Sequence, residues 1–349
     1  MLKSASEKTT LTGSFVSKAS QRKPTRASGA MATERVIDPD RPVPFIFQRR
    51  INRAELVNTV SCRSAGGSIY PNLGELLTVK IAALIMAHHR PDLLDALLDR
   101  LSSPLWARYV HIDKNSDIAR FAGAEKQASM TPGRIAVHWG HVSQTHATLA
   151  LLRQALSDRE VTHFALMSGQ CWPILADEAI FARLRTCAQG GNFIDLTDFP
   201  NSAHRITRLS RRHFYDAPNQ HLRRLKGQLF GFLPNPAAVR LIAEGNLRSG
   251  SNWWLLSRRA AARIMAFVDA QPSYLAAFRH AKCGDEIFFN SAFHRLGLQA
   301  DAPGPTFANF APGSPNAATL TEAMWHQAPR DSHFIFARKI DGFRPSAGG

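Results

Sequence analysis

Two adjacent carboxylates, Asp285 and Glu286, precede a segment whose apolar residues recur at the spacing of one helix face. In the first turn of a helix, carboxylates interact favourably with the helix dipole. A carboxylate held rigidly at a pocket mouth can also take a proton from an attacking hydroxyl. On their own, these residues favour a simpler interpretation, an N-terminal aspartate followed by a solvated glutamate. The catalytic interpretation therefore depends on the other polar clusters. The apolar face comprises Phe288, Phe289, Ala292, Phe293 and Leu296.

A pair of cations, Arg338 and Lys339, follows the apolar segment 334–337. A lysine presents a point charge to a phosphate, whereas an arginine presents a planar fork. The pair could equally be solvated. The acidic pairs that could hold a metal, Asp113 with Asp117 and Asp195 with Asp198, lack Asp-x-Asp spacing. Without a metal, fixed cations such as Arg338 and Lys339 would have to stabilise a bound phosphate. The GxGxxG and GxxxxGK[ST] phosphate-binding patterns are both absent from the sequence.

The elements that must position these groups alternate between strands and helices. The pattern predicts buried strands at 79–86, 106–112, 134–138, 164–167, 192–196 and 250–257, and a C-terminal strand at 334–337. Helices between them imply a largely parallel sheet, which gathers ligands at the carboxyl ends of its strands. Polar clusters fall at such ends, at residues 88–90, 113–117, 140–143, 168–172 and 195–198.

Composition and charge limit the protein class. The chain has 349 residues, a hydrophobic content of 44% and a charged content of 20%, as in an ordinary globular protein. No apolar run approaches the ~20 residues of a membrane span. The net charge of +16 favours polyanionic partners, namely nucleotide phosphates, nucleic acid or an anionic membrane surface. Residues 204–226 concentrate it, with seven Lys/Arg against Asp216 alone.

The predicted domain organisation has three parts. Residues 1–77 are expected to be a poorly structured basic extension, 78–341 the folded domain and 342–349 a frayed tail. The basic segment 204–226 interrupts the strand–helix rhythm and is expected to be a long connection or lobe over the sheet. The four cysteines are far apart, which favours reduced thiols over disulfides or a zinc site. They are Cys62, Cys171, Cys187 and Cys283.

Five blocks carry a family resemblance: 87–89 (Ala-His-His), 110–114 (Val-His-Ile-Asp-Lys), 166–173 (Leu-Met-Ser-Gly-Gln-Cys-Trp-Pro), 250–254 (Gly-Ser-Asn-Trp-Trp), and Asp285-Glu286 with 336–339 (Phe-Ala-Arg-Lys). In this order they resemble the core-2/I-branching β-1,6-N-acetylglucosaminyltransferase family, which includes peptide O-xylosyltransferases. The resemblance covers about residues 78–341. It implies an α/β, GT-A-like fold with a largely parallel sheet flanked by helices.

The resemblance also implies inverting transfer of a sugar of the GlcNAc or xylose class from a UDP-sugar, with no cofactor or metal. The catalytic base matches Glu286, and the lysine that binds the diphosphate matches Lys339. An acidic residue that binds the acceptor matches Asp195. Of the two tryptophans, which must face opposite sides of a strand, Trp253 is taken as the second acceptor contact. The uridine and ribose contacts match Ala87, His88, His89, Asp113, Lys114 and Ser143. Because adjacent histidines point in different directions, at most one of the two is expected to touch ligand.

The sequence departs from the family pattern at the diphosphate site. A second basic residue, an arginine, is expected between the Glu286 helix and Lys339, yet residues 309–325 contain none. Arg330 or Arg338 is the candidate replacement.

Three functional interpretations follow. The first is a cytoplasmic or membrane-peripheral transferase of bacterial type, with a carbohydrate or glycoconjugate acceptor and no nucleic-acid partner. The alternatives are a polyanion-binding α/β protein, for which the charge is the argument, and a degenerate transferase that binds UDP without catalysis.

Overall fold

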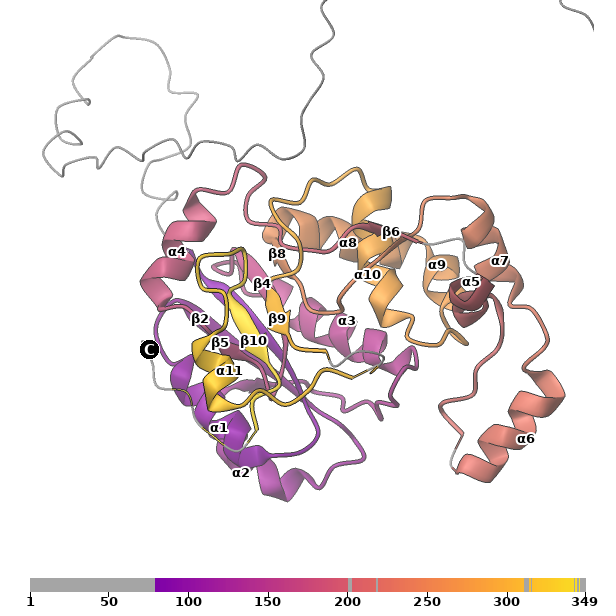
Figure 1. Cartoon of the computed structure of the whole chain (residues 1–349), viewed down its shortest axis with the longest axis horizontal. Coiled ribbons are helices and arrows are strands. Elements are labelled where there is room, and N and C mark those ends of the chain that lie inside the picture. The colour runs from indigo at the N-terminus through magenta and orange to yellow at the C-terminus, as the bar shows by residue number, and fades with distance from the viewer. Residues whose placement is uncertain are drawn as a thin grey trace, which may run out of the picture. The chain divides into compact units, whose positions relative to one another are not determined.

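The computed structural model describes residues 79–199, 203–217, 219–310, 314, 316–341, 343 and 345 (Figure 1). The predictions for residues 1–77 lie outside the described residues, and so do most of those for 342–349. Among the described residues, the helices are too short or too polar to cross a membrane.

The central sheet has the strand order β3-β2-β1-β4-β8. Its middle strand, β1 (Ile81–Ala87), pairs in parallel with β2 (Trp106–Ile112) and β4 (His163–Ser168). At the edges, β3 (Ser129–Met130) is parallel to β2, whereas β8 (Leu255–Ser257) is antiparallel to β4. The unbroken apolar run of β1 suits a strand that is buried on both faces. Because β1, β2, β3 and β4 are all parallel, the prediction of a largely parallel sheet is confirmed.

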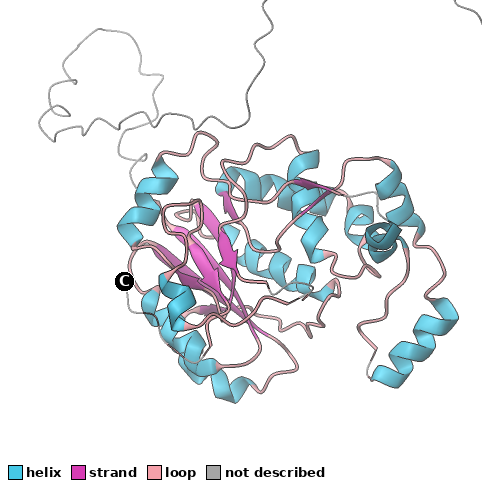
Figure 2. Ribbon diagram, in the orientation of Figure 1, coloured by secondary structure: helices cyan, strands magenta, loops and turns pink. Residues whose placement is uncertain are grey.

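Alternate residues of β1 enter two separate cores, because successive side chains of a strand point to opposite faces. Ala82 and Leu84 face one core, and Ile81, Ala83 and Ile85 face the other. Helices cover both faces (Figure 2). The first core is closed by α3 (Ser143–Leu156), α8 (Arg258–Ala270) and α10 (Asp285–Arg295), and the second by α1 (Pro91–Arg100), α2 (Ala122–Gln127) and α4 (Asp177–Arg185).

A small second sheet brings the C-terminal part of the chain back beside the first. Its central strand, β10 (Phe336–Arg338), pairs antiparallel with β5 (Trp172–Pro173) and parallel with β9 (Thr306–Ala308). The strand predicted at 334–337 is thus present with shifted ends. A further pair joins β6 (Thr197–Asp198) to β7 (Arg248–Ser249).

The predicted strand at 134–138 is wrong. This segment belongs to no strand: the backbone N–H of Ile135 donates to His111 Nε2 at 2.9 Å and that of Val137 to Asp113 Oδ1 at 3.2 Å, while the Ile135 carbonyl accepts from the Lys114 N–H. The ladder position beside β2 belongs to β3 instead. A pattern of alternating apolar residues cannot distinguish these two ways of satisfying the backbone.

Two further strand predictions are only partly right. Residues 192–196 contribute an isolated bridge from Phe193 to Leu255, and strand structure in 250–257 begins only at β8. Within 204–226, the expected connection is helical. The described helices of this region and of the remaining chain are α5 (Ala203–Ser210), α6 (Gln220–Phe230), α7 (Pro236–Ala243), α9 (Pro272–Ala277), α11 (Glu322–His326) and a 3-10 turn at Ile118–Phe121.

Candidate active site

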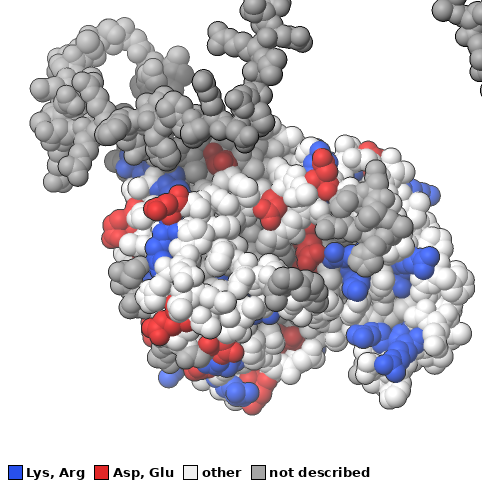
Figure 3. Space-filling model, in the orientation of Figure 1, with Lys and Arg blue, Asp and Glu red and all other residues white. Residues whose placement is uncertain are grey.

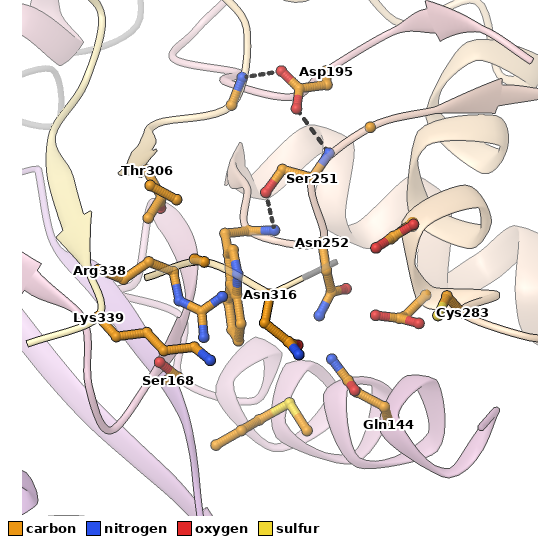
Figure 4. Close-up of a pocket in the computed structure, with 18 of the residues that line it drawn as sticks. Gln144, Ser168, Asp195, Ser251, Asn252, Cys283, Thr306, Asn316, Arg338 and Lys339 are labelled. Atoms are coloured by element: carbon orange, nitrogen blue, oxygen red, sulfur yellow. Dashed lines mark hydrogen bonds between the residues drawn. The ribbon is translucent and has the colours of Figure 1, made fainter. Parts of the chain in front are cut away.

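A cavity of about 1230 Å³ lies at the carboxyl ends of β1, β2 and β4 (Figure 4). This is the edge at which a parallel sheet gathers its ligands. Nine of the predicted site residues line it: Ala87, His88, His89, Asp113, Asp195, Trp253, Glu286, Arg338 and Lys339. Lys114, Ser143 and Arg330 are outside this lining.

Glu286 lies in the first turn of α10 with its side chain about half exposed to the cavity. Its Oε2 accepts a hydrogen bond of 2.7 Å from Nη2 of Arg208, a residue of α5. Arg208 also donates to the backbone carbonyls of Lys282 and Cys283, just before the helix. The guanidinium therefore fixes both the carboxylate and the segment that leads into α10. Sequence reasoning missed Arg208, because in the sequence it is one of many arginines in a basic stretch.

Asp285 differs sharply from its neighbour, although both carboxylates line the cavity. It is 7% exposed, and its Oδ1 has no hydrogen-bond partner among the described residues. Burial, and secondarily the charge of Glu286, raise the pKa of the Asp285 carboxyl to about 7. The two adjacent acids are therefore a buried carboxyl that readily holds its proton and an exposed carboxylate paired with an arginine.

The opposite wall carries the two cations. Figure 4 shows Arg338 and Lys339 on one side of the cavity and Cys283, at the start of α10, on the other. The guanidinium carbon of Arg338 lies 4.3 Å from the ring centroid of Trp253, a cation–π contact. Burial lowers the pKa of Arg338, and burial together with Arg338 lowers the pKa of Lys339. Within the described part of the chain, neither forms an ion pair with a carboxylate, so both charges are available to an anion.

His88 and His89 follow β1, and both line the cavity, with ring centroids 4.1 Å apart. They form a bend after the strand, and the expectation that at most one of them touches ligand stays a prediction. Burial is the main cause of a lowered pKa in each ring, and the charge of Lys339 also lowers both.

The other nucleoside candidates divide between cavity and scaffold. Asp113 lines the cavity, and its Oδ1 accepts from the backbone N–H groups of Asn115 and Val137. Lys114 is exposed to solvent elsewhere. Ser143 is buried at the start of α3, where its Oγ accepts from the backbone N–H of His138. The predicted roles of Lys114 and Ser143 remain predictions.

Asp195 ties together two loops of the cavity wall (Figure 4). Its Oδ2 accepts from the Ser251 N–H and its Oδ1 from the Gly304 N–H, each at 2.8 Å. A Cβ on Gly250 would lie 2.1 Å from Asp195 Cβ, so this close approach requires glycine. The carboxylate is thus a structural clamp that also faces the cavity.

The two tryptophans of the Gly250 block separate as their adjacency predicts. Trp254 is fully buried against Phe289, and Trp253 lines the cavity beneath Arg338. Asn252, which sequence reasoning passed over inside this block, is 6% exposed and lines the cavity. Both of its amide atoms lack a protein partner among the described residues. A buried amide without partners is costly, so it is suited to hydrogen bonding with a bound ligand.

No cluster of three or more His, Cys, Asp or Glu residues suited to a metal occurs in the described ranges. Cys171, Cys187 and Cys283 are free thiols there, as predicted, and Cys62 lies outside those ranges. Burial raises the pKa of the Cys283 thiol to about 11, which argues against a thiolate nucleophile in the cavity.

The sequence of the chain matches a known protein family. Residues 81–303, more than half of the chain, match the family described as Branch, Core-2/I-Branching enzyme. None of the curated protein sequences matches the chain significantly. These findings, with the observed architecture, agree with the α/β, GT-A-like fold that the resemblance implies.

Similar solved structures include glucosyl-3-phosphoglycerate synthase from Mycobacterium tuberculosis in complex with Mn²⁺, UDP and phosphoglyceric acid. It is 14% identical, the match covers 66% of this chain and 69% of that chain, and the TM-score is 0.34. Another is 4-diphosphocytidyl-2C-methyl-D-erythritol synthase from Anaerococcus prevotii, at 12% identity, 66% and 88% coverage, and a TM-score of 0.31. At such scores these likenesses carry no functional argument.

Proposed function

The chain belongs to the Core-2/I-branching enzyme family, and from this premise we propose that it is an inverting glycosyltransferase that uses a UDP-sugar donor. One observation carries the proposal: Glu286, paired with Arg208, shares a single cavity with the unpaired cations Arg338 and Lys339. The cavity, at about 1230 Å³, exceeds the ~300–1,000 Å³ of a typical ligand pocket, which supports a site for a donor together with an acceptor.

Glu286 is the proposed general base. The acceptor hydroxyl gives its proton to the Glu286 carboxylate as its oxygen attacks the anomeric carbon. The bond from that carbon to the diphosphate oxygen breaks on the opposite side, and UDP leaves with the electron pair. The Arg208 hydrogen bond supports this role, because it leaves the second carboxylate oxygen, Oε1, for the hydroxyl.

Lys339 and Arg338 are the proposed diphosphate contacts, since fixed cations stabilise the charge that develops on the leaving group. For the missing family arginine, the geometry favours Arg338 over Arg330. Arg330 donates to the backbone carbonyls of His326 and Ala328 and lies over the ring of Trp325, outside the cavity lining. Metal independence remains part of the proposal and is tested by chelation.

The remaining contacts are assigned by their position in the cavity. We assign uridine and ribose to Ala87, His88, His89 and Asp113, which line the cavity at the ends of β1 and β2. We assign the acceptor side to Asp195 and to Asn252, whose free amide suits a sugar hydroxyl. Trp253 lines the cavity in contact with Arg338 and remains the other proposed acceptor contact. The proposed donor is a sugar of the GlcNAc or xylose class.

A panel of UDP-sugars, scored for donor hydrolysis in the presence of EDTA, tests this function without knowledge of the acceptor. The proposal predicts release of UDP from one donor class by the wild-type protein. Stabilisation by UDP without any turnover would identify a degenerate transferase. Absence of both UDP binding and turnover would refute the nucleotide-sugar assignment.

A further inference from the structure

The helix α6 (Gln220–Phe230) contains no buried residue and stands apart from the body of the protein (Figure 1). Leu225 and Leu229 are 50% and 52% exposed, and with Leu222 they fall on one helix face. Phe230 and Phe232 extend this apolar surface at the end of the helix, at 45% and 64% exposure. A helix that gains nothing from the protein core in this way has a surface suited to an external partner.

The same helix is basic. Arg223 and Arg224 are exposed and Lys226 is half-buried, and no acidic residue occurs between Asp216 and Glu244. In Figure 3 the charged side chains visible over the α6 end are those of Lys and Arg. An apolar face combined with a basic face is the pattern of a helix that lies in the interface of a membrane.

We propose that α6 docks on an anionic phospholipid membrane, with the leucine face inserted among the lipids and the basic side chains at the headgroups. Long basic side chains can bury their stems and keep the charge at the headgroup level. Nucleic acid would account for the arginines but would leave Leu225, Leu229 and Phe232 in water. A second copy of the chain would place two basic helices against each other, which is electrostatically unfavourable.

The docking helix is connected to the cavity. The guanidinium of Arg223 lies over the ring of Tyr215, whose ring in turn contacts Trp139, a residue of the cavity lining. Through these contacts we infer that docking of α6 presents the cavity to membrane-linked acceptors. This last consequence rests on the proposed transferase function, whereas the docking itself does not.

Vesicle co-sedimentation of the full chain tests the docking. We expect binding to vesicles that contain phosphatidylglycerol, little binding to pure phosphatidylcholine, and loss of binding in high salt, because salt screens the basic residues. Arg223→Gln/Arg224→Gln and Leu225→Ser/Leu229→Ser should each weaken binding about tenfold or more. The control for the arginine variant is Arg120→Gln/Lys126→Gln, which alters exposed basic residues in the 3-10 turn and α2 after β2. The control for the leucine variant is Met324→Ser, which alters an exposed apolar residue on α11.

Each outcome bears on the proposal. UDP-induced thermal stabilisation of the variants, measured in parallel, reports that they are folded and tests the proposed function separately. Unchanged vesicle binding by both α6 variants would overturn the docking role. Vesicle-independent RNA binding that the arginine variant alone abolishes would assign the helix to nucleic acid instead. A concentration-dependent dimer that the leucine variant dissociates, with no vesicle binding, would assign it to self-association.

Discussion

Arg208 and Glu286 form the ion pair on which the proposed chemistry depends, with 2.7 Å between Nη2 and Oε2. Glu286→Gln removes the proton acceptor and preserves the shape of the side chain. We expect kcat to fall about 10²- to 10⁴-fold while UDP affinity is retained, as measured by steady-state kinetics and calorimetry. The matched control is Glu244→Gln, which breaks a similarly exposed pair with Arg295 away from the cavity. Near-normal turnover by Glu286→Gln would remove Glu286 from the mechanism.

Arg208 is predicted to act through Glu286 and not on the donor. Arg208→Gln should therefore lower kcat and leave UDP affinity nearly unchanged, since the guanidinium orients the carboxylate from α5. Arg208→Lys keeps the charge but loses the planar fork, so partial recovery of kcat is expected. A large loss of UDP affinity in both variants would instead place Arg208 in the donor site.

Ordered blocks that resemble a known family made Glu286, Lys339 and Trp253 candidate site residues, and all three line the cavity. The sequence could not identify Arg208, whose role arises from a contact across 78 positions. The family resemblance selects Glu286 over Asp285 as the base, but the sequence does not show how deeply Asp285 is buried, because burial is a property of the packed helix.

The start of helix α10 buries Asp285, and the titratable and charged groups that act on it are Glu286, Arg208 and Cys283. Its pKa is raised from 3.8 to about 7, so the folded state holds the proton more tightly than the unfolded state. Folding stability from this group is therefore fully present below about pH 4 and is lost as the pH rises to about 7.

Asp285→Asn mimics the protonated form and should remove that loss. We expect the variant to match the wild type at about pH 3, below the unfolded pKa, and to exceed its free energy of unfolding at pH 8, by up to about 4 kcal/mol. Urea unfolding at the two pH values measures the difference. Glu178→Gln, which alters an exposed acid in the first turn of α4, should have a small effect at both. A difference for Asp285→Asn that does not change with pH would contradict the burial argument.

Elements with a clear apolar pattern were the most predictable. The apolar run of β1 indicates a buried strand of a parallel sheet, and the leucine spacing of α1 and α3 indicates helices that pack on that sheet. The segments that shape the cavity follow other rules. In the segment 134–138, backbone N–H groups donate to the side chains of His111 and Asp113, and the Gly250 loop is set by its close contact with Asp195. These arrangements depend on side chains that are distant in sequence.

Considered as a whole, the molecule brings polar groups from the ends of β1, β2, β4 and β10 and from the start of α10 into one cavity. The sequence predicted this convergence because parallel strands end at a common edge. It did not predict how α6 projects from the domain, because a basic stretch with leucines is compatible with a packed lobe or an exposed helix.

Metal dependence is a property of the whole catalytic unit. We expect turnover of the preferred UDP-sugar to survive EDTA, since in the proposal Arg338 and Lys339 replace a metal at the diphosphate. Initial rates with EDTA, and after addition of manganese to the EDTA-treated protein, provide the measurement. Loss of activity that manganese restores would overturn the metal-free proposal.

The central claim is that the unpaired cations of the cavity bind the diphosphate of a UDP-sugar. Calorimetric titration of UDP in EDTA, with the wild type and Lys339→Gln, tests it most directly. The account predicts binding by the wild type and affinity about tenfold or more weaker in the variant, since a charge-assisted contact contributes roughly 1.5–3 kcal/mol. Equal affinity of the two proteins, or no binding of UDP by the wild type, would contradict it.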